Sequence, residues 1–332
     1  MKPGFATRSP WTKTLPEEFL KRKHYDIEPY LPLLQRSGPE ASLFRFDYYD
    51  VISDLYAEAT FKQVYDWCDS QGLKTIGHLL GEETLAAQTY FGGDMLRAFK
   101  YLHIPALDHL GCGIGSLNAK FVASASHHYG KDRVACEAFG ASGWNATYEE
   151  MVQCSNWLFQ QGVNMIIMHG FYYSIRGERY NDFPPSYFFQ WKYWDMMQEY
   201  VPMANRMMNM LSGGIAECDI LVYSPIESFW DHFIPDLDVK TGFWEEGPWI
   251  QDSVASDIDR DFQLLCSHLS DENLDFSILG ADAVINFKAE NGLLANRITG
   301  AQYSILVLPY ANILTDETAR LLGMTLQLQA DL

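Results

Sequence analysis

Apolar and polar positions follow each other along the chain in blocks of different period, and these blocks predict its helices and strands. Apolar side chains from Tyr48 to Cys68 recur with a helical period, which predicts a helix over Asp47–Ser70. Thr147 and Glu150 have the spacing of a capping box, which predicts that another helix begins at Tyr148. Apolar spacing and stop signals complete the set of predicted helices: 94–101, 117–129, 148–161, 186–211 and 258–269.

Short, uniformly apolar runs lie between these helices and indicate buried strands. They are LKTIGHLL (73–80), HIPALDHLG (103–111), RVACEAFG (133–140), NMIIMHGF (164–171), CDILVYSP (218–225), LDFSILGADAV (274–284) and QYSILVLPY (302–310). Because these strands have no polar face, they suit a parallel sheet that is covered by helices. The pattern therefore predicts an α/β fold.

Two segments lack a regular period. Residues 1–45 contain six prolines, which predicts an irregular segment with short helices. The acidic and aromatic stretch from Asp231 to Asp261 is interpreted as a loop-rich insertion.

The first four predicted strands each end in polar residues, as in GHLLGEE, LDHLG, CEAFG and MHGFYYS. A (β/α)8 barrel of the TIM type builds its active site at this edge, so residues 1–215 are predicted to form a barrel domain. Only four such strands precede Cys218, so we expect a partial barrel that lacks its first strands, in a fragment of a longer protein. Residues 216–332 are predicted to form a second, flavodoxin-like α/β domain, also incomplete.

Composition narrows the class of partner. The 332 residues include 24 basic and 43 acidic side chains, a net charge of -19, which disfavours nucleic acids and anionic membranes and favours a neutral or cationic small ligand. No apolar run is long enough to span a bilayer and no export signal is visible, so a cytoplasmic location is expected. The six cysteines are too scattered for a zinc motif, and the oligomeric state stays open between a monomer and a homo-oligomer.

Glu137 is the first candidate for chemistry, because it ends an apolar strand and precedes the small residues of GASGW. It could instead cap the turn or pair with an arginine. As a catalytic carboxylate it would need a partner, since glycoside hydrolysis uses two carboxyl groups that flank the scissile bond. The available partners are Glu82, Glu83 and Asp108, which follow or end the two preceding strands.

Other polar and aromatic residues at the same edge are candidates for substrate contacts. His78 and His169 occupy equivalent strand ends, and neither has the spacing of a zinc site, so the metal assignment is left unknown. Trp144, Tyr172, Tyr173 and Arg176 suit a sugar ring, which offers both C–H patches and hydroxyl groups. The alternative for the run 169–182 is a buried loop held by arginine pairs. The glycines of GCGIGS (111–116) lack the spacing of a dinucleotide loop and are discounted.

These motifs, in their order along residues 10–215, resemble the family 106 α-L-rhamnosidases. PWTKTLPEEFLKRKHYDIEPYLPLL, GHLLGEE, HIPALDHLG, CEAFGASGW and HGFYYSIRGER carry the resemblance. Residues 216–332 resemble the glutamine-amidotransferase-like domain that follows the barrel in such enzymes and in family 42 β-galactosidases, where it has an assembly role.

The resemblance implies an exo-acting glycoside hydrolase with a carbohydrate substrate, with Glu137 and Glu82 as the catalytic pair. It implies no required cofactor, although such rhamnosidases can hold a calcium ion near the substrate. Three alternatives stay open: a β-galactosidase-like hydrolase, a non-catalytic carbohydrate-binding or assembly protein on a truncated barrel, and a metal-dependent sugar isomerase.

Overall fold

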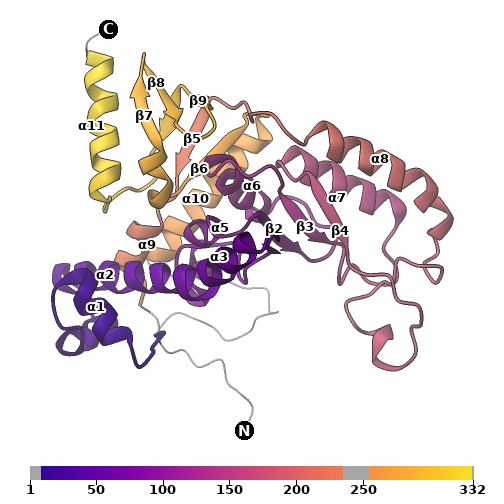
Figure 1. The fold of residues 1–332 in the computed structure, drawn as a ribbon, viewed down its shortest axis with the longest axis horizontal. Helices are drawn as coiled ribbons and strands as arrows, with labels where there is room; N and C mark the ends of the chain where they lie inside the picture. Colours follow the sequence, from indigo (N-terminus) through magenta and orange to yellow (C-terminus); the bar gives the residue numbers. More distant parts are fainter. Residues whose placement is uncertain (1–8, 235–253, 331–332) are drawn as a thin grey trace.

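Two parallel sheets organise the chain, and the computed structural model describes residues 9–234 and 254–330 (Figure 1). The first sheet has the strand order β1-β2-β3-β4, with β1 (Ile76–Gly77), β2 (Ile104–His109), β3 (Ala135–Ala138) and β4 (Met165–Met168). All three pairs of neighbouring strands are parallel. The predicted α/β fold with a parallel sheet is therefore confirmed.

Strands that follow each other in chain order are joined by right-handed crossovers, which place their helices on one face of the sheet. Here α6 packs against β2 and α8 packs against β4. The other face is partly open, since Ile167 of β4 is 42% exposed. In the described residues this sheet stops at four strands and does not close into a (β/α)8 barrel, so the partial barrel expected from the sequence stays a prediction beyond its α/β pattern.

The helices agree with the periodic blocks, with a few corrections. They are α1 (Leu15–Lys23), α2 (Pro39–Tyr56), α3 (Gln63–Ser70), α4 (Leu85–Phe91), α5 (Met95–Phe99), α6 (Asn118–His128), α7 (Tyr148–Gln160), α8 (Met197–Met210), α9 (Ile226–His232), α10 (Val254–Asp271) and α11 (Asp316–Ala330). A short π-helical stretch, η2 (Ala57–Lys62), joins α2 to α3, so the predicted helix over Asp47–Ser70 is confirmed and begins earlier. The capping box at α7 forms both of its bonds.

Three predicted segments differ from the structure. The strand over 73–80 is reduced to the two residues of β1. The helix over 186–211 begins only at the short turn η4 (Trp194–Met196), and the irregular segment before it buries Tyr187 and Trp191. Tyr187 packs edge-on against Phe139, for example. Of the predicted insertion Asp231–Asp261, residues 235–253 lie outside the described part, and residues from Val254 onward belong to α10.

The second parallel sheet has the order β10-β5-β6, with β5 (Ile220–Tyr223), β6 (Phe276–Leu279) and β10 (Ile305–Val307). Beside it lies a small antiparallel sheet of β7 (Phe287–Glu290), β8 (Leu293–Asn296) and β9 (Gln302–Tyr303). Helix α6 packs against both β2 and β6 and so lies between the two parallel sheets (Figure 1). One buried hydrophobic cluster includes residues from both sides of position 215, and the division into two domains there stays a prediction.

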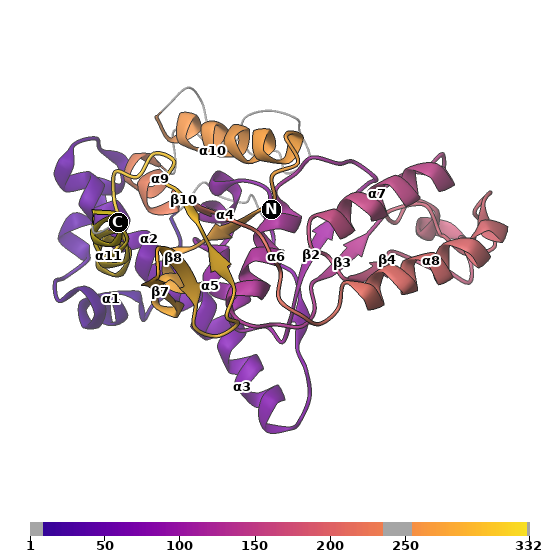
Figure 2. The ribbon, with the colours of Figure 1, turned by 90° about the horizontal axis from the view of Figure 1, so that it is seen from above.

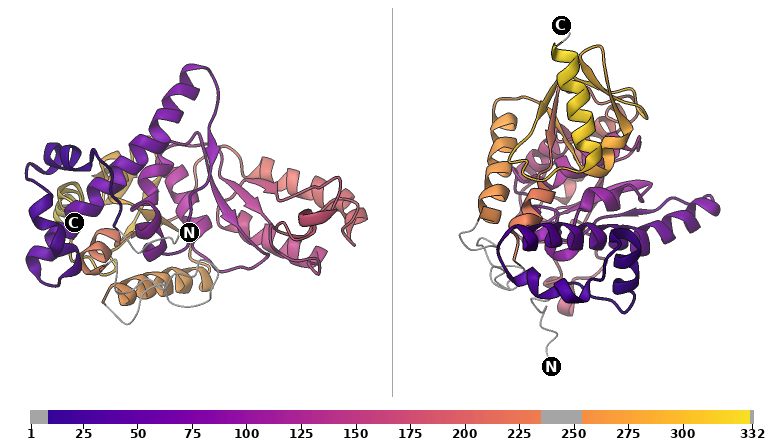
Figure 3. Two further views of the ribbon diagram at one scale, coloured as in Figure 1. Left: turned by 90° about the horizontal axis from the view of Figure 1, so that it is seen from below. Right: turned by 90° about the vertical axis from the view of Figure 1, so that its left-hand side faces the viewer.

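The views from other sides show where the helices lie around these sheets. Helices α7 and α8 pack together and extend away from α1 and α2 (Figure 2). Helix α11 (yellow) and α1 (indigo) lie at the same end of the long axis, and the right-hand view of Figure 3 shows α11 at the top and α1 well below it. None of the helices in the described part of the chain is both long and apolar enough to cross a bilayer.

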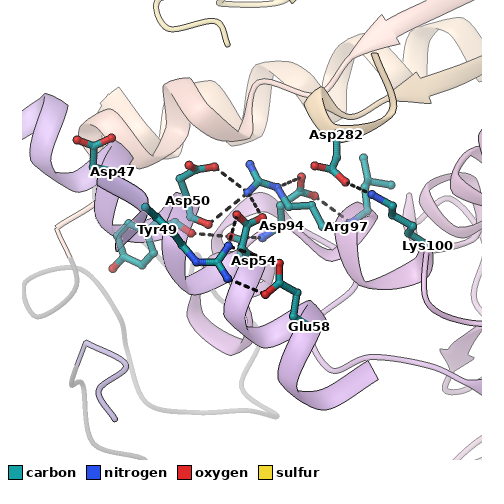
Figure 4. A network of polar contacts seen from close by, with 12 residues as sticks. Asp47, Tyr49, Asp50, Asp54, Glu58, Asp94, Arg97, Lys100 and Asp282 are labelled. Atoms are coloured by element: carbon teal, nitrogen blue, oxygen red, sulfur yellow. Dashed lines mark hydrogen bonds and ion pairs between the residues drawn. The ribbon is translucent and has the colours of Figure 1, made fainter. Parts of the chain in front are cut away.

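An ion-pair network joins the amino-terminal helices to the rest of the molecule (Figure 4). The side chain of Arg97 on α5 is only 6% exposed, and its Nη1 lies 2.7 Å from Asp50 and 2.9 Å from Asp54, both on α2. Its Nε lies 3.4 Å from the buried Asp94 carboxylate. Nearby, Lys100 pairs with Asp282 at 3.1 Å and extends the network to the region between the sheets.

The free energy of unfolding should depend on pH because α9 carries a buried carboxyl group, that of Glu227. Burial, and then the nearby Asp94 charge, raise the pKa of Glu227 from 4.5 to about 8. Between these values the unfolded chain releases a proton that the folded chain keeps, so the free energy of unfolding should fall as pH rises. The Glu227→Gln variant lacks this titrating group. Relative to the wild type, its free energy of unfolding should therefore rise by up to about 1.4 kcal/mol per pH unit between pH 5 and 8.

Urea unfolding of both proteins at pH 5, 6, 7 and 8 measures this difference. Glu272→Gln, which changes an exposed carboxylate after α10, is the matched control and should leave the free energy of unfolding nearly unchanged. A constant difference between Glu227→Gln and the wild type over this range would contradict the assignment.

Candidate active site

A cleft of about 730 Å³ lies at the carboxyl edge of the first sheet, where the sequence places its polar strand ends. Two of the predicted site residues, Glu82 and Asp108, line it. The others that matter for its chemistry are Glu83, His109, Ser116, Asn118 and Phe183. The cleft thus collects carboxylates, hydrogen-bond donors and an aromatic ring from four segments of the chain.

Asp108 and Glu137 lie side by side at this edge. They are direct partners in the parallel pairing of β2 with β3, and Ile167 of β4 is the next residue across the same face. Alternate residues of a strand share one face, so both carboxylates project toward the open side of the sheet. Burial raises the pKa of Asp108; nearby His78 opposes that change and the Glu137 charge adds to it.

His78 connects the Glu137 carboxylate to the end of β1. Its Nε2 lies 3.7 Å from Glu137 Oε2, and its Nδ1 lies 2.8 Å from the carbonyl oxygen of Leu79. Because a carbonyl can only accept, Nδ1 must carry the proton in this contact. Nε2 can then attract Glu137 only when it is protonated as well. The Glu137 side chain is 40% exposed, which leaves it accessible to a ligand.

Glu82 differs from Glu137 in being closed off from solvent. It is 2% exposed, and its two oxygens accept hydrogen bonds from the backbone N–H groups of Leu79 and Asp108. Burial raises the pKa of Glu82 well above its ordinary value, and the two backbone bonds act in the opposite direction. Burial also raises the pKa of the neighbouring Glu83. The predicted pairing of Glu82 with Glu137 as the two catalytic carboxylates stays a prediction.

His169 follows β4 and contributes an aromatic corner to the same edge. Its ring lies edge-on to Phe183, with 5.7 Å between centroids, and edge-on to Tyr172 at 6.3 Å. In the described residues, its buried Nδ1 atom has no hydrogen-bond partner. Close packing continues beneath the ring, where a Cβ atom at Gly140 would lie 3.2 Å from the His169 Cγ. His169 is not among the residues that line the cleft, and its role as a substrate contact stays a prediction.

The remaining predicted contacts lie outside the cleft, in the loops after β3 and β4. Trp144 stacks on Tyr180, with 4.9 Å between centroids, and its Nε1 donates to the carbonyl oxygen of Tyr180. Tyr172 donates to the carbonyl oxygen of Asp182. Tyr173 is 87% exposed and Arg176 is exposed, and neither lines the cleft. Their roles as substrate contacts stay predictions.

Sequence reasoning missed part of the cleft wall. The glycine-rich loop after β2, discounted as a dinucleotide site, supplies Gly113, Ile114 and Ser116 to the wall. His109 holds this loop, since its Nε2 lies 2.8 Å from the carbonyl oxygen of Gly113. The sequence could have indicated this, because the loop follows directly after a strand end. Phe183 gave no such signal, because it is 12 residues or more from any strand end in the sequence.

A protein site for a metal ion needs several His, Cys, Asp or Glu side chains close together. The described residues contain no group of three or more His, Cys, Asp and Glu side chains placed to hold a metal ion. Calcium takes six to eight oxygen ligands, usually including several carboxylates. The calcium ion that the family resemblance implies stays a prediction.

Comparison with known proteins decides the family. The family model for α-L-rhamnosidases of glycoside hydrolase family 106 matches residues 5–237, more than half of the chain. The chain belongs to this family. The match covers every strand end that lines the cleft. A comparison with curated proteins finds none that matches.

A solved structure supports the fold of this rhamnosidase-family chain. The rhamnosidase from Novosphingobium sp. PP1Y matches it with a TM-score of 0.66 and 18% sequence identity. The match covers 94% of this chain and 28% of that chain. This family member therefore spans little more than a quarter of the length of the solved rhamnosidase, and at this identity the likeness concerns the fold.

Proposed function

We propose that this chain is a glycoside hydrolase that removes terminal α-L-rhamnose and carries both of its catalytic carboxyl groups. The observation that carries the proposal is the pairing of Asp108, which lines the cleft, with Glu137 at the same level of the neighbouring strand, in a chain of the α-L-rhamnosidase family. Carboxyl groups in different environments suit the separate acid and base roles that hydrolysis needs.

Asp108 is the general acid in this proposal and Glu137 is the general base. Burial raises the pKa of Asp108, which favours the protonated form that an acid requires. Asp108 donates its proton to the glycosidic oxygen as the C1–O bond breaks. Glu137, which is more exposed, accepts a proton from the water that attacks C1. The products are the free sugar, the released alcohol, an ionised Asp108 and a protonated Glu137.

The substrate contacts in this proposal come from residues that line the cleft. Ser116 and Asn118 offer polar groups to sugar hydroxyl groups, and Phe183 offers an aromatic edge for C–H groups. The net charge of -19 suits an uncharged sugar better than an acidic one. Residues 216–332, with the parallel strands β5, β6 and β10, are assigned an amidotransferase-like structural role without chemistry of their own.

Hydrolysis of aryl glycosides tests the substrate class. The purified chain should release nitrophenol from 4-nitrophenyl α-L-rhamnoside at least 100-fold faster than from the β-D-galactoside. The galactoside is the control because the β-galactosidase-like alternative predicts the opposite order. Equal rates on both, or none above the buffer blank, would contradict the proposal.

One observation favours a second candidate, a carbohydrate-binding protein without catalysis. The first sheet has four strands in the described residues and leaves one face partly open. Such a site could hold a sugar without excluding water from it. Calorimetric titration with L-rhamnose separates the two functions: binding without turnover of the aryl glycoside supports the second candidate, and turnover supports the first.

A further inference from the structure

The Glu82 carboxylate accepts a backbone hydrogen bond from β2 at a point where β1 is too short to accept it. The backbone N–H of Ile104 on β2 donates to the carbonyl oxygen of Thr75, beside β1. Every second N–H of a strand points to the same neighbour, so the N–H of Asp108 points the same way. By then β1 has ended, at Gly77. The Glu82 carboxylate takes the place of the missing strand, with Oε2 3.1 Å from the Asp108 nitrogen.

A tight turn brings Glu82 to this place. Its other oxygen, Oε1, lies 2.6 Å from the backbone nitrogen of Leu79, three residues earlier. Between them Gly81 has a φ of +78°, and a Cβ atom there would lie 2.4 Å from a ring carbon of Phe91. Only glycine accepts both conditions. The turn therefore directs the carboxylate back across the ends of β1 and β2.

We propose that Glu82 is a positioning residue, which rests on the proposed hydrolase function: it fixes the backbone at Asp108 and so sets the acid against Glu137. It does not transfer a proton itself. Both of its oxygens face backbone donors, and the residue is 2% exposed, so no oxygen is presented to a glycosidic bond.

The chemistry of the leaving group separates positioning from acid catalysis. A 2,4-dinitrophenyl rhamnoside leaves without protonation, whereas a methyl rhamnoside needs an acid. Loss of a general acid therefore slows the second substrate far more than the first. Misplacement of the reacting groups slows both substrates, and a shift of about 1 Å can cost about 100-fold.

The experiment compares turnover of 2,4-dinitrophenyl and methyl α-L-rhamnoside by the wild type and three variants. Glu82→Gln places an amide N–H₂ against a backbone N–H, so it loses one bridging bond while keeping its shape. We expect kcat to fall about 10- to 100-fold on both substrates, with their ratio unchanged within a factor of about three. Asp108→Asn should lose the methyl glycoside selectively. Glu83→Gln, which changes the adjacent carboxyl group in the same cleft, should change both rates less than Glu82→Gln does.

The ratio of the two rates does not depend on how much of a variant is folded, so partial unfolding leaves the test intact. Selective loss of the methyl glycoside in Glu82→Gln, with the wild type active, would overturn the positioning role alone. A wild type inactive on both substrates would overturn the proposed function and this inference together. Faster amide hydrogen exchange at Asp108 in Glu82→Gln would further support the bridge, and unchanged exchange would contradict it.

Discussion

Glu137→Gln should reduce hydrolysis of 4-nitrophenyl α-L-rhamnoside by about 100- to 10,000-fold, the range typical for a lost general base. The amide keeps the size of the side chain but cannot accept a proton from water. The fold should be unaffected, because Glu137 is 40% exposed and its contact with His78, at 3.7 Å, is partly solvated. Steady-state kinetics, with far-UV circular dichroism as a check of the fold, measures the effect.

Glu149→Gln is the matched control for this variant. It makes the same chemical change at an exposed carboxylate in the first turn of α7, just beyond the loop that follows β3, and should keep full activity. Azide can replace the missing base as an external nucleophile, so added azide should restore turnover in Glu137→Gln and not in Asp108→Asn. Near-normal hydrolysis by Glu137→Gln would remove Glu137 from the mechanism.

Arg97→Met should destabilise the fold by about 3–5 kcal/mol, as is usual when one partner of a buried ion pair is removed. The methionine fills similar space but leaves the carboxylates of Asp50, Asp54 and Asp94 without their shared cation. Asp94 is 1% exposed, and burial already raises its pKa to about 6 with Arg97 present. Urea unfolding at pH 7 measures the loss.

A second substitution shows whether charge causes this loss. Asp94→Asn in the Arg97→Met background removes one of the carboxylates that have lost their cation. This double variant should recover part of the lost free energy of unfolding. Arg260→Met is the control, because Arg260 forms ion pairs on the surface of α10 and its loss should change the free energy of unfolding little. Equal destabilisation in the single and double variants would mean that packing, and not charge, decides the outcome.

Helices and strands that depend on residues close together in the sequence could be predicted from it. Helix α7 begins where Thr147 and Glu150 bond each other's backbone across one turn, and no distant residue takes part. Short apolar runs bounded by turn signals predicted β2 to β5, and β5 is buried along its whole length. The length of β1 was overestimated. LKTIGHLL is apolar enough for a longer strand, but β1 ends at Gly77, and the chain then turns at Gly81 and brings Glu82 to the end of the strand.

The role of each carboxylate could not be predicted in the same way. In the sequence, the residues Glu82, Asp108 and Glu137 are all acids near strand ends. Only the fold shows that their carboxyl groups have different environments. Burial and two backbone bonds close off Glu82, whereas the pairing of β2 with β3 sets Asp108 beside an accessible Glu137. The Arg97 network likewise joins residues from position 50 to position 97, far apart in the chain.

The sequence by itself determined the α/β pattern, the order of the first four strands, the polar edge and the family, because periodicity and motifs depend on residues near one another in the chain. The tertiary structure alone decided which acids line the cleft, Glu82, Glu83 and Asp108 among them, and how far each acid is buried. Burial, strand register and the distance between charges arise from contacts between distant segments, and no local pattern encodes them.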